Sequence, residues 1–256
     1  MSITIKLPYH IDSYTILCED ENICRVFKEH YGRYCYDTVD GTILIKVYRE
    51  RSGWRINTGG KELYTDDPVQ VLHNILYSEK RIQPGIFALH AGAVCRNGKA
   101  SVFAASTTSG KTTLITYLVQ NGFEYVSDDC VFIDMRNNTV YPYHNPIHLR
   151  FGGAEVLKHC GCLPESLIYS DERYIFTPDN LSCERMELDR IFFIERGGAN
   201  ETVLLSKSDA LNHLLISPIV SYPLTGDYIR FLSNIIPLCS RLRYRNMEFV
   251  AKVICC

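Results

Sequence analysis

Apolar and polar residues alternate in two stretches near the start of the chain, SITIKL (2–7) and GTILIKVYRE (41–50). A period of two is typical of a half-buried strand, so both stretches predict strands. Between them, ENICRVFKEHYGRY (21–34) has apolar residues at helical spacing, and RSGWRINTGGKELY (51–64) is typical of one or two hairpins. Together these patterns predict a small α+β unit.

A helix with clear start signals is predicted in TDDPVQVLHNILYSEK (65–80). Asp66 or Asp67 can cap its first turn, and Pro68 suits the first helical position. One apolar stripe runs along this segment and consists of Val69, Leu72, Ile75 and Leu76. The stripe predicts that one face of the helix is buried.

A strand, a loop and a helix follow one another in the next part of the chain. Two apolar runs in IFALHAGAVCRNGKASVFAAS (86–106) are joined by an Asn-Gly pair (97–98), the strongest short hairpin signal. The second run leads into ASTTSGKT (105–112), and TTLITYLVQNG (112–122) predicts a helix that ends at its own Asn-Gly pair. FEYVSDDCVFID (123–134) then predicts one strand with two aspartates in its middle.

The rest of the chain shows no internal repeat and no low-complexity linker. Its pattern predicts an extended proline-punctuated segment, a buried strand, an amphipathic helix, a second helical segment and a terminal strand: VYPYHNPIHLRFGG (140–153), LDRIFFIERGG (188–198), SKSDALNHLLIS (206–217), TGDYIRFLSNIIPLCSRLRYR (225–245) and MEFVAKVIC (247–255).

Composition changes this picture little. The chain has 256 residues, of which 46% are hydrophobic and 22% charged, enough for one large domain or two modest ones. We place a boundary after the first 81 residues, so that 1–81 form the small α+β unit and 82–256 the larger domain. A formal net charge of −2 gives no basic field for nucleic acid or an anionic membrane. Without an apolar run of roughly 20 residues or a secretory signal, we expect a cytoplasmic protein with no nucleic-acid or membrane partner.

The cysteines predict no special chemistry. Eleven are scattered along the chain and none forms a C-x-x-C pair, so a disulfide framework is not expected. HCGC (159–162) is the best candidate for a metal site, but it has no partner cluster elsewhere. Incidental thiols are therefore favoured over zinc.

The loop at 105–112 has the ending of a phosphate-binding loop, Gly110-Lys111-Thr112, but begins with Ala105 where the usual pattern has glycine. A strand that feeds such a loop into a helix directs backbone N–H groups and the helix dipole at one point. Lys111 can add a mobile charge for the β- and γ-phosphates, and the Thr112 hydroxyl can bind Mg²⁺.

The expected nucleotide-binding residues are Ala105, Ser106, Thr107, Thr108, Ser109, Gly110, Lys111, Thr112 and Thr113. The alternative is a Ser/Thr-rich turn that only caps the helix. Thr108 fits the loop less well than glycine, because a β-branched residue resists the left-handed backbone that glycine permits, although its hydroxyl could add a phosphate contact, and we still expect a nucleotide to bind.

Four stretches in order, LHAGAV, ASTTSGKTTL, GFEYVSDD and YPYHNPIHLR, resemble the HPr kinase/phosphorylase family and its relatives, among them small kinases associated with modified-peptide gene clusters. The resemblance covers about residues 86–150. It implies an α/β fold: a P-loop-containing catalytic domain like those of HPr kinase and phosphoenolpyruvate carboxykinase, preceded here by the small α+β unit. Two features depart from the family: Thr108, where relatives usually have glycine, and the lack of a phosphorylase signature downstream.

The resemblance also implies roles for acidic and basic residues. Asp128 is the expected base, paired with His90, and Asp129 is the second acidic residue and a Mg²⁺ ligand, although the two aspartates could exchange roles. Adjacent strand residues point to opposite faces, so Asp128 and Asp129 can share a site only at a strand end or bulge. In the alternatives, one aspartate is a turn or cap residue and His90 is a core histidine. Arg150 is either a phosphate contact or a surface arginine.

Glu195 and Arg196 lie at the end of a predicted buried strand, where site residues often occur, and no role is assigned to them.

The loop chemistry predicts a nucleotide site, and the resemblance implies an ATP- and Mg²⁺-dependent kinase that transfers the γ-phosphoryl group to a serine or threonine hydroxyl of a peptide or protein. A kinase for a small metabolite and a non-catalytic nucleotide-binding regulator are the alternatives. Neither H-R-D nor D-F-G is present, so a eukaryotic-type protein kinase is excluded. The small N-terminal unit could recognise a peptide by strand addition. The oligomeric state is left open.

Overall fold

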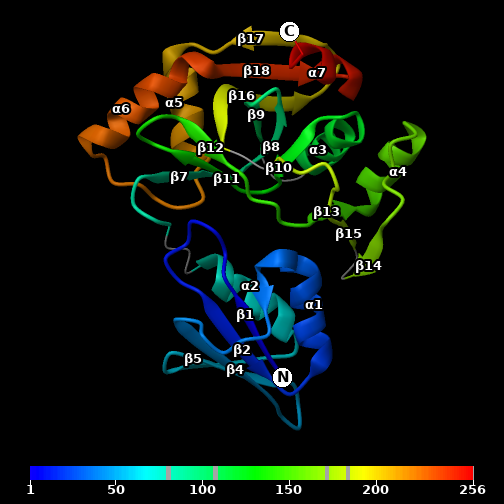
Figure 1. Ribbon diagram of the computed structural model, residues 1–256, viewed down its shortest axis with the longest axis vertical. Coiled ribbons are helices and arrows are strands. Elements are labelled where there is room, and N and C mark those ends of the chain that lie inside the picture. Colours follow the sequence, from blue (N-terminus) through cyan, green and yellow to red (C-terminus); the bar gives the residue numbers. More distant parts are fainter. Residues whose placement is uncertain (79–81, 106–108, 171–172, 183–184, 256) are drawn as a thin grey trace. The chain divides into compact units, whose positions relative to one another are not determined.

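The computed structural model describes residues 1–78, 82–105, 109–170, 173–182 and 185–255. The chain divides into two compact units, Met1–Gln83 and Pro84–Cys256. Each unit combines helices with β-sheet, so the fold class is mixed α/β (Figure 1).

The described part of the first unit contains a six-stranded sheet in the order β3-β1-β2-β4-β5-β6, two α-helices and one short 3₁₀-helix. Its elements are β1 Ser2–Ile5, β2 Tyr14–Cys18, α1 Glu21–Tyr31, the 3₁₀-helix η1 Gly32–Tyr34, β3 Cys35–Tyr36, β4 Ile43–Arg49, β5 Trp54–Thr58, β6 Lys61–Thr65 and α2 Pro68–Ser78. The predicted start of α2 is confirmed: the helix begins at Pro68, and of the two candidate caps Asp67 accepts a hydrogen bond from the Gln70 N–H at 2.9 Å. The strand β2 and the short β3 were not predicted.

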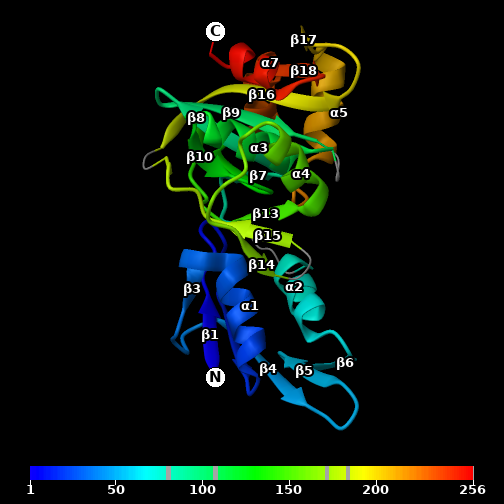
Figure 2. The ribbon, with the colours of Figure 1, turned by 90° about the vertical axis from the view of Figure 1, so that its right-hand side faces the viewer.

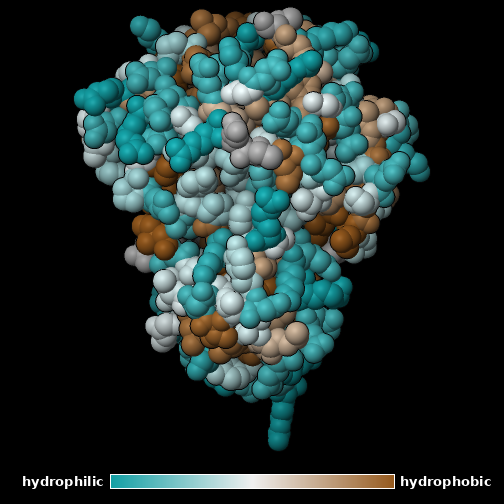
Figure 3. Space-filling view, in the orientation of Figure 1, coloured by the Kyte–Doolittle hydropathy of each residue, from teal (hydrophilic) through white to brown (hydrophobic). Residues whose placement is uncertain are grey.

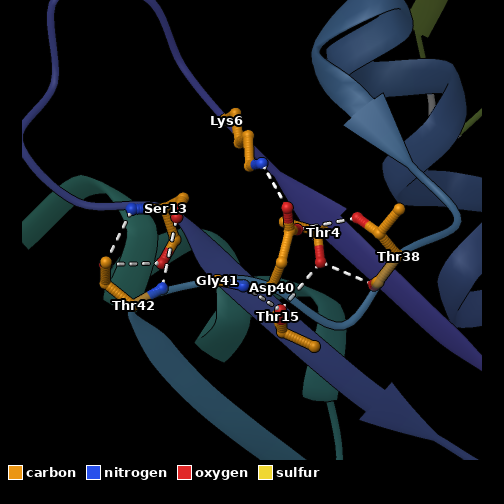
Figure 4. Close-up of polar contacts among 8 residues, drawn as sticks. All are labelled: Thr4, Lys6, Ser13, Thr15, Thr38, Asp40, Gly41 and Thr42. Atoms are coloured by element: carbon orange, nitrogen blue, oxygen red, sulfur yellow. Dashed lines mark hydrogen bonds and ion pairs between the residues drawn. The ribbon is translucent and has the colours of Figure 1, made fainter.

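A buried polar network fastens the loop before β4 to β1 and β2 (Figure 4). The hydroxyls of Thr4 and Thr15 are hydrogen-bonded at 2.7 Å, Thr4 also donates to the Thr38 carbonyl at 2.7 Å, and Thr15 accepts from the Gly41 N–H at 2.9 Å. A Cβ atom on Gly41 would lie 2.6 Å from the backbone nitrogen of Thr15, so only glycine fits there. These bonds satisfy hydroxyls that are fully buried.

The second unit is built on a nine-stranded sheet in which β10-β8-β9-β16-β12-β11-β7 are consecutive neighbours and β18 joins β16 to β17. Its strands are β7 Ile86–Leu89, β8 Ala91–Arg96, β9 Lys99–Ala104, β10 Glu124–Ser127, β11 Val131–Asp134, β12 Thr139–Tyr141, β16 Met186–Arg196, β17 Glu201–Leu204 and β18 Cys239–Tyr244. Its helices are α3 Lys111–Gln120, α5 Lys207–Ile216, α6 Gly226–Ile235, the 3₁₀-helix η2 Ile236–Leu238 and α7 Met247–Val253.

Helices cover both faces of this sheet. On one face, α3 and α7 share a hydrophobic cluster with Phe103 of β9, Phe192 of β16 and Leu242 of β18. On the other face, α5 and α6 pack against Val102 of β9 and Ile191 of β16 in a second cluster. Successive side chains of β9 and β16 point to opposite faces of the sheet, and helices bury both faces. This explains why the sequences of these two strands are almost continuously apolar.

A smaller three-stranded sheet and one helix complete the second unit. The elements are β13 Ile147–Arg150, α4 Phe151–His159, β14 Ile168–Ser170 and β15 Arg173–Phe176. The strand order is β13-β15-β14, and α4 lies beside α3 (Figure 2). The predicted extended segment 140–153 is therefore right for β12 and β13 but wrong at its end, where FGG opens a helix.

Three other predictions of element type are wrong. The segment 123–134 is not one strand: a turn at Asp128–Cys130 separates β10 from β11. The helical prediction for 225–245 fails after η2, because Cys239–Tyr244 pairs with β16 as a parallel strand. The predicted terminal strand is α7, which begins after Asn246, whose side chain accepts from the Phe249 N–H. A short apolar segment has no intrinsic preference strong enough to decide between helix and strand, and here its N-cap decides.

Within the described residues, no helix is long and apolar enough to cross a membrane. The surface seen in Figure 3 is largely hydrophilic, with small separate hydrophobic areas. The cysteines in the described part of the chain are free thiols, and no cluster of three or more metal-binding side chains occurs there.

Candidate active site

Five strand ends meet at one edge of the nine-stranded sheet. Strands β9, β16 and β18 are parallel to one another, while β8 is antiparallel to β9 and to β10. The start of β8 and the ends of β10, β9, β16 and β18 therefore lie along the same edge, in the order β10-β8-β9-β16-β18. His90 precedes β8, and the two aspartates follow β10, so residues distant in sequence become neighbours.

The Gly110 loop, residues 105–110, connects β9 to α3 at this edge. Gly110 is the N-cap of α3 and has φ +89°, a left-handed conformation that explains the need for glycine. Ala105 and Ser109 are partly buried, and Ser106, Thr107 and Thr108 lie outside the described residues. The Ser109 hydroxyl oxygen is buried without a hydrogen-bond partner in the described part of the chain. The first N–H groups of α3 have no partner within the helix, and the Ser109 hydroxyl lies two residues before the helix begins.

Lys111 is buried at the first position of α3, with only 6% of its surface exposed. Its Nζ lies 3.1 Å from His90 Nε2 and 3.7 Å from Asp129 Oδ1. Because an ammonium group only donates, His90 Nε2 accepts this hydrogen bond and the ring proton sits on Nδ1. Nδ1 in turn donates to the Asp129 carbonyl at 3.0 Å. The structure thus joins three of the predicted site residues, and the pairing of His90 with the Asp128 carboxylate stays a prediction.

Asp128 and Asp129 follow the last residue of β10, the strand-end position that two adjacent carboxylates need in order to share a site. Asp129 has φ +69°, a left-handed conformation uncommon outside glycine. Asp128 is buried, at 1% exposed, whereas the Asp129 side chain is 46% exposed and faces Lys111. The two carboxylates therefore have different surroundings although they are adjacent in sequence.

Burial and the neighbouring Asp129 raise the pKa of Asp128 to about 7, while Lys111 and a hydrogen bond with the Thr112 side chain oppose the rise. Its Oδ1 has no hydrogen-bond partner among the described residues. Gly92 makes room for this carboxyl group, since a Cβ atom there would lie 3.2 Å from Asp128 Oδ1 and 2.6 Å from Ile115 Cγ1. Sequence reasoning missed Gly92; the small residues around His90 are the only signal for it.

The remaining predicted residues divide into two groups. Thr112 belongs to the cluster through its contact with Asp128. Thr113 instead faces α4, because a Cβ atom on Gly153 would lie 2.6 Å from Thr113 Oγ1. Arg150 is the exposed N-cap of α4, and no ion pair holds its side chain in the described part of the chain. Among the described residues, no hydrogen bond or ion pair joins the Arg150 side chain to the cluster.

This arrangement can bind an anion and move a proton. The start of α3 and Lys111 supply positive charge, and hydroxyl and carboxylate oxygens suitable for Mg²⁺ lie beside them. A carboxyl group with a pKa near 7 can take a proton from a hydroxyl and release it again near neutral pH.

Comparison with known proteins adds little. No family model matches the chain, and no curated protein matches it. Among solved structures, the chain is similar to the HPr(Ser) kinase/phosphatase from Coxiella burnetii, with 10% sequence identity over 65% of this chain and 93% of that chain. The TM-score is 0.33, so this likeness carries no argument. Any function must therefore follow from the residues of the site.

Proposed function

We propose that the second unit is an ATP- and Mg²⁺-dependent kinase that transfers the γ-phosphoryl group to a serine or threonine hydroxyl of a peptide or protein. One observation carries the proposal: Asp128, a buried carboxyl group with one oxygen that has no hydrogen-bond partner among the described residues, lies in one cluster with Lys111, the first residue of α3 after the left-handed Gly110. Phosphate binding and proton transfer need these two groups close together.

The Gly110 loop and Lys111 would bind the phosphates of ATP. Backbone N–H groups at the start of α3 have no partners within the helix, and the helix dipole favours an anion there. Lys111 already makes contacts to His90 and Asp129, so its ammonium group is positioned before a nucleotide arrives. His90 accepts from Lys111 and is fixed by its own bond to the Asp129 carbonyl, so it would position Lys111 rather than take part in transfer.

Asp128 would act as the base. The acceptor hydroxyl oxygen attacks the γ-phosphorus, the bond from that phosphorus to the β,γ-bridging oxygen breaks, ADP leaves, and Asp128 takes the hydroxyl proton. Asp129 and Thr112 would hold Mg²⁺, which neutralises phosphate charge and orients the γ-phosphoryl group when bound. Two protein ligands suffice, because Mg²⁺ usually completes its shell with water and substrate phosphates.

The peptide or protein acceptor is supported by the order of the four sequence stretches that resemble peptide and protein kinases of one family. A nucleotide-binding regulator needs no base, and the position of Asp128 counts against it. Transfer to a small metabolite would use the same chemistry, so the assay must offer both kinds of acceptor.

The test compares the parent with Lys111→Ala. Transfer from γ-labelled ATP is measured on a library of serine- and threonine-containing peptides and on a set of hydroxylated metabolites, and melting is followed with and without Mg²⁺ and ATP. We expect the parent to label peptides and to melt higher with Mg²⁺ and ATP, because a ligand that binds only the native state stabilises it. Lys111→Ala should lose most transfer, because a charge-assisted contact in a buried site is worth several kcal/mol to the transition state.

Lys99→Ala is the matched control, since Lys99 is an exposed lysine at the opposite end of β9. It should behave like the parent. If only metabolites were labelled, the acceptor would be a small metabolite and not a peptide or protein. Nucleotide binding without any transfer would favour the regulator, and no melting shift with millimolar ATP would contradict both functions.

A further inference from the structure

Two residues on the far side of the Gly110 loop share the sheet edge with the candidate active site. Arg196 ends β16 and Tyr244 ends β18, and they are direct partners in the parallel pairing of these strands. Ile194 and Leu242, two residues earlier on each strand, belong to the cluster that packs against α3. Because side chains two residues apart point to the same face, Arg196 lies on the α3 face together with Tyr244.

The Tyr244 hydroxyl lies close to Gly110, the N-cap of α3. A Cβ atom on Gly110 would be 3.6 Å from this hydroxyl oxygen. Tyr244 is only 3% exposed, and its hydroxyl makes no hydrogen bond in the described part of the chain. Burial raises the pKa of Tyr244, with Arg196 opposing the rise, so the phenol is a neutral donor at physiological pH. A neutral tyrosine hydroxyl beside Gly110 can therefore donate a hydrogen bond to an anion that binds at the start of α3.

Arg196 carries a charge that no described carboxylate neutralises. Its neighbour on the opposite face of the sheet, Arg243, is held by Glu195 at 2.7 Å and by Glu201 at 2.9 Å. Arg196 is exposed and forms no ion pair within the described residues. Its guanidinium group is therefore available for a second anionic contact near α3, in addition to Lys111.

The order of strand ends indicates which part of a nucleotide these residues would meet. Asp128 follows β10, two strands to one side of β9, whereas Arg196 and Tyr244 end the strands on the other side. The reacting γ-phosphoryl group must face the base, so the rest of the nucleotide extends from the Gly110 loop away from Asp128.

We propose that Arg196 and Tyr244 bind the phosphates of the nucleotide that are not transferred, on the side of the Gly110 loop opposite Asp128. This inference rests on the proposed function. Contacts to the α- and β-phosphates are present equally in ADP and ATP, so they contribute the same binding free energy to both nucleotides.

The experiment measures dissociation constants of the full chain for Mg²⁺-ADP and for the Mg²⁺ complex of the β,γ-imido analogue of ATP. Arg196→Gln should weaken both by about tenfold or more and by the same factor, as expected for one charge-assisted hydrogen bond. Tyr244→Phe, which keeps the ring in the core, should weaken both by a few fold. Arg243→Gln, on the opposite face, should bind like the parent, and all three variants should keep the melting temperature of the free protein within a few degrees.

Three results would overturn the inference. Unchanged affinities of Arg196→Gln would mean that Arg196 makes no nucleotide contact. Loss of affinity for the ATP analogue alone would assign Arg196 to the transferred group. An equal loss in Arg243→Gln would show a general effect of charge. A parent that binds neither nucleotide contradicts the proposed function itself, whereas tight binding by the parent and by Arg196→Gln contradicts only this inference.

Discussion

At the scale of single residues, the candidate site contains two buried polar atoms that lack partners among the described residues. Asp128 Oδ1 and Ser109 Oγ are both buried without a hydrogen bond in the described part of the chain. Such groups cost stability in a protein that binds nothing, because their desolvation is not compensated. The Gly110-Lys111-Thr112 ending and the aspartate pair were visible in the sequence. Which carboxylate is buried was not, because it depends on the left-handed backbone at Asp129.

Asp128 should make the free protein less stable as pH rises. Its pKa is about 7 in the folded chain and about 4 in the unfolded chain, so the native state binds more protons between these values. The contribution of this group to stability is therefore complete below about pH 4, falls as pH rises, and levels off above pH 7. Between pH 5 and 8 the fall should be about 2–3 kcal/mol in the parent and absent in Asp128→Asn.

Urea unfolding without nucleotide and with a chelator, at pH 5, 6, 7 and 8, measures this difference. Asp227→Asn is the control, because the Asp227 side chain is 88% exposed, and it should follow the parent. If the parent and Asp128→Asn lost the same stability over this range, Asp128 would be ionised in the free protein throughout it. Burial would then not raise the pKa of Asp128.

At the scale of elements, predictions from the sequence succeeded where one segment carries its own signals. The Asn97-Gly98 turn between β8 and β9 is confirmed by positive φ at both residues, and α3 ends at the predicted Asn-Gly pair. Predictions failed where a partner strand decides. The apolar run 86–96 is broken at His90 because β7 pairs with β11, whereas β8 pairs with β9. No local pattern records which strand will be the neighbour.

The contact between α3 and α4 should depend on one of two adjacent glycines. A Cβ atom on Gly153 would lie 2.6 Å from Thr113 Oγ1 and 2.9 Å from Leu149 Cδ1, whereas one on Gly152 would have no neighbour within 4 Å. Gly152→Ala should raise the free energy of unfolding by up to about 1 kcal/mol, because alanine favours the helix. Gly153→Ala should lower it by about 1–3 kcal/mol, because the added methyl group overpacks the contact.

Denaturant unfolding of both variants measures this difference, and each variant is the control for the other. Equal stabilisation by both substitutions would show that α4 does not pack closely on α3.

At the scale of the whole molecule, the chain contains two units, and every residue of the candidate site belongs to the second. The sequence suggested a boundary after residue 81, and the compact units divide between Gln83 and Pro84. The first unit supplies none of the side chains that the proposed mechanism uses to bind phosphate or accept a proton. Nucleotide binding should therefore need only the second unit.

Residues 84–256 expressed alone should fold and bind Mg²⁺-ATP. Their two hydrophobic clusters and the whole strand edge are internal to this unit. We expect a dissociation constant within about threefold of the full chain, a difference below about 0.7 kcal/mol, by calorimetric titration. A folded unit that binds ATP far more weakly would show that residues 1–83 complete the nucleotide site.

The proposed kinase depends above all on a buried carboxylate beside Lys111 that accepts a proton during phosphoryl transfer. The decisive experiment measures the rate of transfer at saturating Mg²⁺-ATP, together with the ATP dissociation constant, for Asp128→Asn and Asp129→Asn. Asn keeps the shape but cannot accept the proton, so Asp128→Asn should lower kcat by about 10²–10⁴-fold with ATP affinity unchanged or slightly better. Asp129→Asn should weaken the binding of both Mg²⁺ and ATP, because the two ligands bind together. If both variants bound ATP and transferred phosphate like the parent, the aspartates would be structural and the kinase assignment of this site would be wrong.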